Sequence, residues 1–190
     1  MNEKLCNVPN ILTISRIPLT VLLCVFIDQR LWLLALITFV VAAITDWIDG
    51  WWARKFNQLS TFGRLFDPLT DKILIGSAFI FLVTVPKSAM ETWMVAVVIG
   101  RELLITGVRG YLESLGKKFA ADWFGKLKTI LQCGWLVAVL AYLTIHNQVW
   151  AEPLVSLVEI LHYGLLYAML AATMLSGLQY CVKAVKMLTE

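Results

Sequence analysis

The sequence predicts an all-α integral membrane protein with six transmembrane helices, folded as one domain over residues 1–190. Three observations support this fold class: the composition, the length of the apolar stretches and the distribution of basic residues. Hydrophobic residues make up 59% of the chain and charged residues 15%, and the mean hydropathy is +0.77. A soluble domain of this length needs more polar surface than this composition supplies. A multi-pass membrane protein is therefore expected.

Six apolar stretches follow one another along the chain. Each is near or above the ~20 residues that a helix needs to cross hydrocarbon. No internal repeat, low-complexity tract or long linker divides them, which predicts a single domain. The stretches cover residues 11–27, 31–56, 65–85, 92–115, 127–145 and 155–187.

The first stretch, residues 11–27, has a cleaved signal peptide as its competing interpretation. Arg16 interrupts the apolar core, and no small-x-small cleavage site follows it closely, so we expect the segment to remain in the protein. Pro18 is expected to bend this helix, because proline has no amide hydrogen to continue the hydrogen-bond ladder. Residues 28–30 then supply a short turn into the second stretch.

Basic residues lie mostly on one side of the six predicted spans. An even number of spans puts both termini on the same side, and the excess of Lys and Arg there makes that side cytoplasmic. The acidic residues described next belong to the same face. The cytoplasmic side receives Lys4, Arg54, Lys55, Arg64, Lys117, Lys118, Lys126, Lys128, Lys183 and Lys186, and the opposite side receives Arg30 and Lys87.

Four aspartates, Asp46, Asp49, Asp67 and Asp71, lie in or beside this apolar sequence. Burying a carboxylate in hydrocarbon costs roughly several kcal/mol unless it meets a cation, so four together predict a metal site. With no histidine or cysteine nearby, oxygen ligands favour Mg²⁺ or Mn²⁺ over zinc or copper, and four carboxylates can hold two ions. The alternative is helix capping and surface ion pairing, which the spacings of three and four residues fit poorly.

The spacing gathers these residues on helix faces. At 100° per residue, an arc of about 140° contains, in order, Asp49, Ala53, Asp46, Gly50 and Arg54. This face combines two carboxylates, two small residues that let a ligand approach the backbone, and a guanidinium suited to phosphate. Asp67 and Asp71 share a face of the next helix. The polar turn at residues 57–61 allows the two helices to stand antiparallel, so that the carboxylates converge.

The same residues resemble the signature of the CDP-alcohol phosphotransferases, D-x-x-D-G-x-x-A-R, eight residues, G-x-x-x-D-x-x-x-D. The pattern is matched without a gap by Asp46, Asp49, Gly50, Ala53, Arg54, Gly63, Asp67 and Asp71. The resemblance implies the family's membrane fold over the whole chain, with a polar cavity at the cytoplasmic side. It also implies an enzyme that moves the phosphoryl-bearing half of a cytidine-diphosphate-linked donor onto an alcohol and releases CMP.

The resemblance assigns roles within the motif. Asp46, Asp49 and Asp67 are expected to hold the two metal ions. Asp71 is expected both to contact metal and to be the base that takes the acceptor hydroxyl's proton. Room for the nucleotide would come from Gly50, Ala53 and Gly63, and Arg54 would pair with its phosphate. For Arg54, a plain positive-inside residue is the alternative.

The opening helix, in the stretch VPNILTISR, also resembles that of the family. The resemblance places Asn10, Thr13 and Arg16 where they could approach the nucleotide. An amino-terminal helix cap at Asn10 explains that residue equally well.

Basic residues of the fourth and fifth stretches are the candidates for acceptor binding. Arg101 and Arg109 lie in GRELLITGVRG, where two arginines at membrane depth should face an anion or a carboxylate. We expect Arg101, Arg109 and Lys126 to form a basic pocket for the phosphate of the acceptor. The alternative is an internal ion pair between Glu102 and an arginine, which would tie the bundle together.

The stretches GRELLITGVR and WFGKLKT resemble the branch of the family that makes phosphatidylglycerophosphate. This implies CDP-diacylglycerol as donor and glycerol 3-phosphate as acceptor; serine, inositol phosphate or phosphatidylglycerol are the alternative acceptors. The resemblance further implies a homodimer in the bacterial inner membrane, with both termini and the active site cytoplasmic. No nucleic-acid partner is expected.

Two other classes of function are weighed against an enzyme. Intramembrane carboxylates also line cation transporters and channels. Such a path needs acidic residues that continue toward the far face, but beyond the motif the interior spans hold Glu102 and Glu113, both toward the cytoplasmic half. A purely structural membrane subunit would leave the acidic motif unexplained.

Overall fold

The computed structural model describes residues 8–56, 61–116, 123–146 and 152–189. Side chains at positions 8–12, 49–51, 53–54, 61–68, 124, 152–153 and 188–189 also lie outside the description. Regular structure within the described residues is helical. In chain order it comprises α1 (Val8–Asp28), α2 (Trp32–Lys55), α3 (Thr61–Leu82), the short 3₁₀ helix η1 (Pro86–Ser88), α4 (Thr92–Ser114), α5 (Trp123–Ile145) and α6 (Glu152–Thr189).

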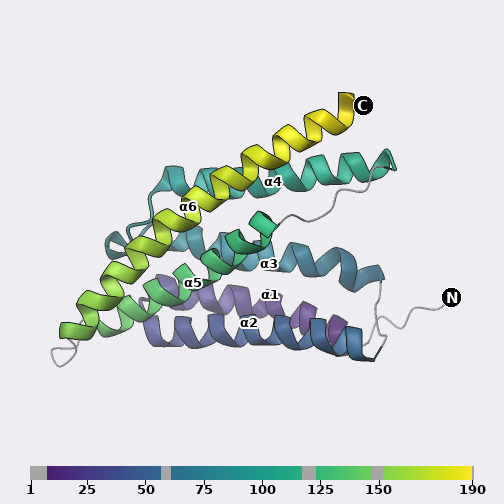
Figure 1. Cartoon of the computed structure of the whole chain (residues 1–190). Helices are drawn as coiled ribbons and strands as arrows, with labels where there is room; N and C mark the ends of the chain where they lie inside the picture. Colours follow the sequence, from purple (N-terminus) through teal and green to yellow (C-terminus); the bar gives the residue numbers. More distant parts are fainter. Residues whose placement is uncertain (1–7, 57–60, 117–122, 147–151, 190) are drawn as a thin grey trace.

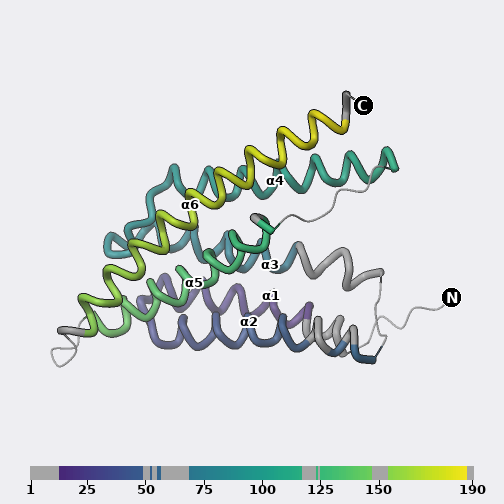
Figure 2. Tube along the Cα trace, viewed as in Figure 1, coloured from purple at the N-terminus to yellow at the C-terminus, as the bar shows by residue number. Residues whose placement is uncertain are grey.

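The long helices form an elongated bundle (Figure 1). In this bundle α1 packs against both α2 and α3, α2 also packs against α5, and α4 packs against α3 and α6. The trace in Figure 2 shows α5 between the α1–α2 pair and α6. The consecutive helices α5 and α6 pack against each other. The end of the bundle where α1 begins is also the end where α6 finishes (Figure 1). This arrangement agrees with the predicted placement of both termini on one side.

The six predicted helices are confirmed, with boundaries that shift by a few residues. Four helices start earlier than their apolar stretches, because polar residues can continue a helix beyond the hydrocarbon-like segment: α1 at Val8, α3 at Thr61, α5 at Trp123 and α6 at Glu152. Pro18 lies inside α1, which continues through it. The turn at residues 28–30 is confirmed, with Arg30 in the left-handed region at φ 59°.

The main core draws buried apolar side chains from all six long helices. Phe79 of α3 and Trp135 of α5 are fully buried and meet edge to face, with ring centroids 5.1 Å apart. Replacing Phe79 with alanine is expected to lower the free energy of unfolding by about 3–5 kcal/mol, because it removes a buried ring and leaves a cavity. Unfolding of the detergent-solubilised protein measures this. Ile80→Ala is the matched control: Ile80 is 53% exposed on the same helix and should cost much less.

Large apolar side chains cover the outside of the bundle. Ile160 is 73% exposed and Val182 70%, a degree of exposure that is unfavourable in water but suits lipid. Among the described residues, two helical segments are long and apolar enough to cross a bilayer, Gly125–Ile145 and Leu154–Met187. A shorter apolar helix covers Trp32–Ile48. The prediction of six spans is therefore supported for two of them by this criterion.

Candidate active site

Three helices meet at a cluster of one arginine and two aspartates. Arg16 of α1 is fully buried, and its Nη1 lies 2.6 Å from Oδ1 of Asp46 on α2. The same nitrogen lies 2.5 Å from Oδ1 of Asp71 on α3. The side chains of Asp46 and Asp71 remain 42% and 41% exposed. The structure thus brings together one aspartate from each half of the acidic motif, as the sequence predicted.

Thr13 lies one turn before Arg16 on α1 and is buried, with 1% of its surface exposed. Its predicted contact with the nucleotide stays a prediction. The remaining residues of the predicted donor and metal site have side chains outside the described residues, so their roles stay predictions: Asn10, Asp49, Gly50, Ala53, Arg54, Gly63 and Asp67.

The aspartate pair fits a hard divalent cation. Oxygen atoms of Asp46 and Asp71 approach a single positively charged nitrogen from two helices, so both can contact one cation. Both carboxylates are partly exposed, which lets an ion from water reach them. Among the described residues, which do not include the side chains of Asp49 and Asp67, no group of three potential metal ligands occurs. His162 is fully buried and stacks on Tyr142, with ring centroids 4.7 Å apart.

An apolar groove adjoins the aspartate pair. It has a volume of about 460 Å³ and lies between α2 and α5. Its lining includes Trp47, which follows Asp46 in the chain. An apolar surface therefore lies beside the residue that bears one carboxylate of the pair. Its lining residues are Phe39, Val40, Ala43, Ile44, Trp47, Cys133, Gly134 and Val137.

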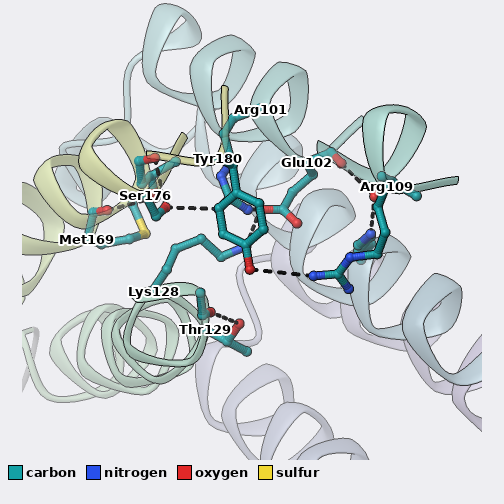
Figure 3. Close-up of polar contacts among 12 residues, drawn as sticks. Arg101, Glu102, Arg109, Lys128, Thr129, Met169, Ser176 and Tyr180 are labelled. Carbon is teal, nitrogen blue, oxygen red and sulfur yellow. Dashed lines mark hydrogen bonds and ion pairs between the residues drawn. The ribbon is translucent and has the colours of Figure 1, made fainter. Parts of the chain in front are cut away.

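A second polar cluster joins α4, α5 and α6 (Figure 3). Arg101 contacts Glu102 at 3.2 Å and donates a hydrogen bond to the Ser176 hydroxyl at 2.9 Å. Lys128 of α5, 4% exposed, forms an ion pair with the same carboxylate of Glu102. The sequence-based alternative of an internal pair between Glu102 and an arginine is thus present, and Lys128 extends it.

Tyr180 of α6 contacts both of the predicted arginines, Arg101 and Arg109. The Arg101 guanidinium lies 5.4 Å from the centre of the Tyr180 ring, and Arg109 donates a hydrogen bond to its hydroxyl at 3.4 Å. Two glycines leave the necessary space. A Cβ atom at Gly177 would lie 3.2 Å from Cγ of Arg101, and one at Gly125 would lie 3.2 Å from the Tyr180 hydroxyl.

We call Arg101, Arg109 and Lys128, with Glu102, the basic cluster. It contains three cations and one carboxylate, which Arg101 and Lys128 contact, so the cluster has an excess of positive charge. The Nε atoms of Arg101 and Arg109 are buried and have no acceptor within the described part of the chain. Buried donors of this kind require an acceptor from elsewhere. An anion such as a phosphate would supply it.

Lys126, the third predicted phosphate ligand, is exposed at the start of α5. Sequence reasoning did not assign Lys128, Ser176 or Tyr180 to the site. A signal for Lys128 was available, since Glu102 at membrane depth requires a cation. For Ser176 and Tyr180 the nearly uniform apolar sequence of α6 offers no comparable signal.

The acidic pair and the basic cluster lie near each other. Lys72 follows Asp71 on α3, and its ammonium donates a hydrogen bond to Thr106 on α4. The hydroxyl of Thr106 in turn donates a hydrogen bond to the carbonyl oxygen of Glu102. Lys72 therefore links the segment of α3 that bears Asp71 to the segment of α4 that bears Glu102.

The sequence was compared with protein families and with curated proteins. Residues 6–182 match the family model described as CDP-alcohol phosphatidyltransferase. A Bacillus subtilis (strain 168) protein named CDP-diacylglycerol–glycerol-3-phosphate 3-phosphatidyltransferase is 39% identical over 156 residues, 74% of this chain and 78% of the relative. Proteins of the same name occur in Escherichia coli (strain K12), 37% identical over 77% of this chain and 81% of the relative, and in Shigella flexneri serotype 5b (strain 8401), 35% identical over 92% of both.

Proposed function

Since the chain belongs to the CDP-alcohol phosphatidyltransferase family, we propose that it transfers the phosphatidyl group of CDP-diacylglycerol to glycerol 3-phosphate, producing phosphatidylglycerophosphate and CMP. One observation in the structure carries this proposal. The acidic pair of Asp46 and Asp71 is linked through Lys72 and Thr106 to the basic cluster, in which two buried arginine nitrogens have no acceptor among the described residues. A site of this kind can hold the reacting pyrophosphate and a second phosphate group at the same time.

In this proposal Asp46, Asp49, Asp67 and Asp71 hold two Mg²⁺ or Mn²⁺ ions. The ions would neutralise the pyrophosphate and assist an in-line displacement at its phosphorus. The acceptor's hydroxyl oxygen forms the new bond to phosphorus as the bond to CMP breaks. Asp71 takes the proton of that hydroxyl, and CMP leaves as the anion. Asp46 and Asp71 come from separate helices, so their positions depend on the packing of α2 and α3 against α1.

The donor is proposed to lie along α2. Gly50, Ala53 and Gly63 leave space for the cytidine nucleotide, and Arg54 pairs with a phosphate of the donor. Asn10 and Thr13 contribute contacts from α1. The apolar groove between α2 and α5 supports a lipid donor, because an acyl chain placed there stays in an apolar environment while its pyrophosphate reaches Asp46.

The phosphate of the acceptor is proposed to bind Arg101, Arg109 and Lys126. The buried Nε atoms of the two arginines support this assignment, because both lack an acceptor among the described residues. Glu102 and Lys128 would then fix Arg101 in place, while Tyr180 orients Arg109. Lys126 is exposed near the polar connection before α5, where it can meet a ligand that arrives from water.

The remaining proposals concern the setting of the enzyme. Six helices span the bacterial inner membrane, with both termini and the polar cavity at the cytoplasmic face. The exposed apolar surface of the bundle and the excess of basic residues on one side support this topology. A homodimer is proposed from the family resemblance alone.

A CMP-release assay tests the proposed reaction. Purified protein in detergent, supplied with CDP-diacylglycerol and Mg²⁺ or Mn²⁺, should release CMP when glycerol 3-phosphate is added. Parallel reactions contain serine, inositol phosphate or phosphatidylglycerol instead, and should stay at background. Turnover with one of these alcohols and none with glycerol 3-phosphate would replace the acceptor. No CMP release with any alcohol would reject the transferase itself.

Removal of divalent ions gives a separate prediction. Excess EDTA should abolish CMP release, because the reacting pyrophosphate then meets carboxylates whose negative charge is no longer compensated. Adding Mg²⁺ or Mn²⁺ back beyond the EDTA concentration should restore it. The assay is the same, and calcium serves as the comparison ion, since it prefers longer and less regular oxygen coordination. Full turnover in EDTA would contradict the proposed metal site.

A further inference from the structure

Arg16 has a geometry that a nucleotide contact does not explain. It is a fully buried arginine in α1, and one of its nitrogens touches Asp46 of α2 and Asp71 of α3. A buried charge is costly unless it is paired, and two carboxylates held close together repel each other. In this arrangement the two carboxylates offset the cost of burying the Arg16 charge, and the Arg16 charge offsets the repulsion between the carboxylates. Arg16 is thus the point at which α1 joins the two helices of the acidic motif.

We propose that Arg16 is a positioning residue that holds Asp46 and Asp71 together and shares their charge with the divalent cation. The inference deepens the proposed function and rests on its metal site. The guanidinium and the metal ion are both cations that favour the same two carboxylates. Each therefore lowers the electrostatic gain available to the other.

This sharing has two consequences for a variant without the positive charge. In EDTA, Asp46 and Asp71 would face each other without the charge of Arg16 between them, so the folded protein should be less stable. In Mn²⁺ or Mg²⁺, the ion would no longer compete with the guanidinium for the pair and should bind more tightly. A ligand that binds only the folded protein stabilises it according to its affinity, so thermal unfolding reports both effects.

The experiment compares wild type and Arg16→Gln in detergent without substrates. Tm is measured in EDTA and along a titration with MnCl₂. We expect Arg16→Gln to have the lower Tm in EDTA, a larger rise with Mn²⁺, and an apparent affinity for Mn²⁺ about tenfold tighter than wild type. Arg16→Lys retains the charge and should keep an affinity for Mn²⁺ close to that of wild type. Lys87→Gln removes a cation from η1 and should behave as wild type throughout.

The outcomes separate this inference from the proposed function. If Mn²⁺ and Mg²⁺ leave the wild-type Tm unchanged, the metal site fails, and the sharing of charge fails with it. If Mn²⁺ raises the Tm of wild type, and Arg16→Gln shows an equal rise or a weaker affinity for Mn²⁺, the proposed role of Arg16 is overturned and the metal site stands. An Arg16→Gln protein that folds only with Mn²⁺ present supports the inference. Should it fold under neither condition, Arg16→Lys decides: an affinity for Mn²⁺ close to that of wild type supports the role of the charge, and an affinity that departs tenfold from wild type overturns it.

Discussion

Asp71→Asn is expected to reduce turnover by at least about 10³-fold while part of the metal and nucleotide binding survives. The amide keeps the shape of the side chain but can neither take the proton of the acceptor hydroxyl nor carry the negative charge. Asp46, Asp49 and Asp67 remain to bind metal, and Arg16 keeps its contact with Asp46. The rate of CMP release at saturating substrate measures turnover, and the Tm shift caused by Mn²⁺ and CDP measures binding.

Asp28→Asn is the matched control for this prediction. Asp28 lies exposed at the end of α1, and its conversion to the amide should leave turnover unchanged. If Asp71→Asn keeps more than a tenth of the wild-type rate, Asp71 is not the base. Loss of all binding together with turnover would instead indicate that Asp71 is mainly a structural partner of Arg16.

The fold was predictable because hydrophobic length dominates the choice of structure in a membrane protein. Each apolar stretch must become a helix that satisfies its own backbone, and the polar breaks between stretches then define the connections. The helix starts were less predictable, as α1 at Val8 and α5 at Trp123 show. Hydropathy marks the hydrocarbon-like part of a helix, whereas the hydrogen-bonded helix continues into polar sequence.

The acidic pair was predictable from local rules, but the partner it contacts was not. The spacing within each half of the motif puts Asp46 and Asp71 on definite helix faces. Both helices pack against α1, which brings the two faces together. The contact with Arg16 depends instead on α1 packing against both helices, which no local pattern encodes. Arg16 could be assigned to the region of the site, yet its pairing required the tertiary structure.

The choice between Lys126 and Lys128 shows the same limit. Two residues apart, they point about 200° apart around the helix, so at most one can face the bundle. The structure exposes Lys126 and buries Lys128 against Glu102. Packing against α2 and α6 decides which face of α5 turns inward. The residues at the start of α5 do not by themselves specify that face.

Arg109→Ala is expected to raise KM for glycerol 3-phosphate by about 10- to 100-fold, the cost of losing a charge-assisted hydrogen bond or two. The KM for CDP-diacylglycerol should stay nearly constant, because the nucleotide is proposed to bind along α2. Tyr180→Phe is the companion variant: it removes the hydroxyl that accepts the hydrogen bond of Arg109 but keeps the guanidinium, so a smaller rise in the same KM is expected. Initial rates of CMP release, with each substrate varied in turn, measure both constants. If Arg109→Ala weakens the use of donor and acceptor equally, Arg109 supports the bundle through Tyr180 and the acceptor phosphate must bind elsewhere.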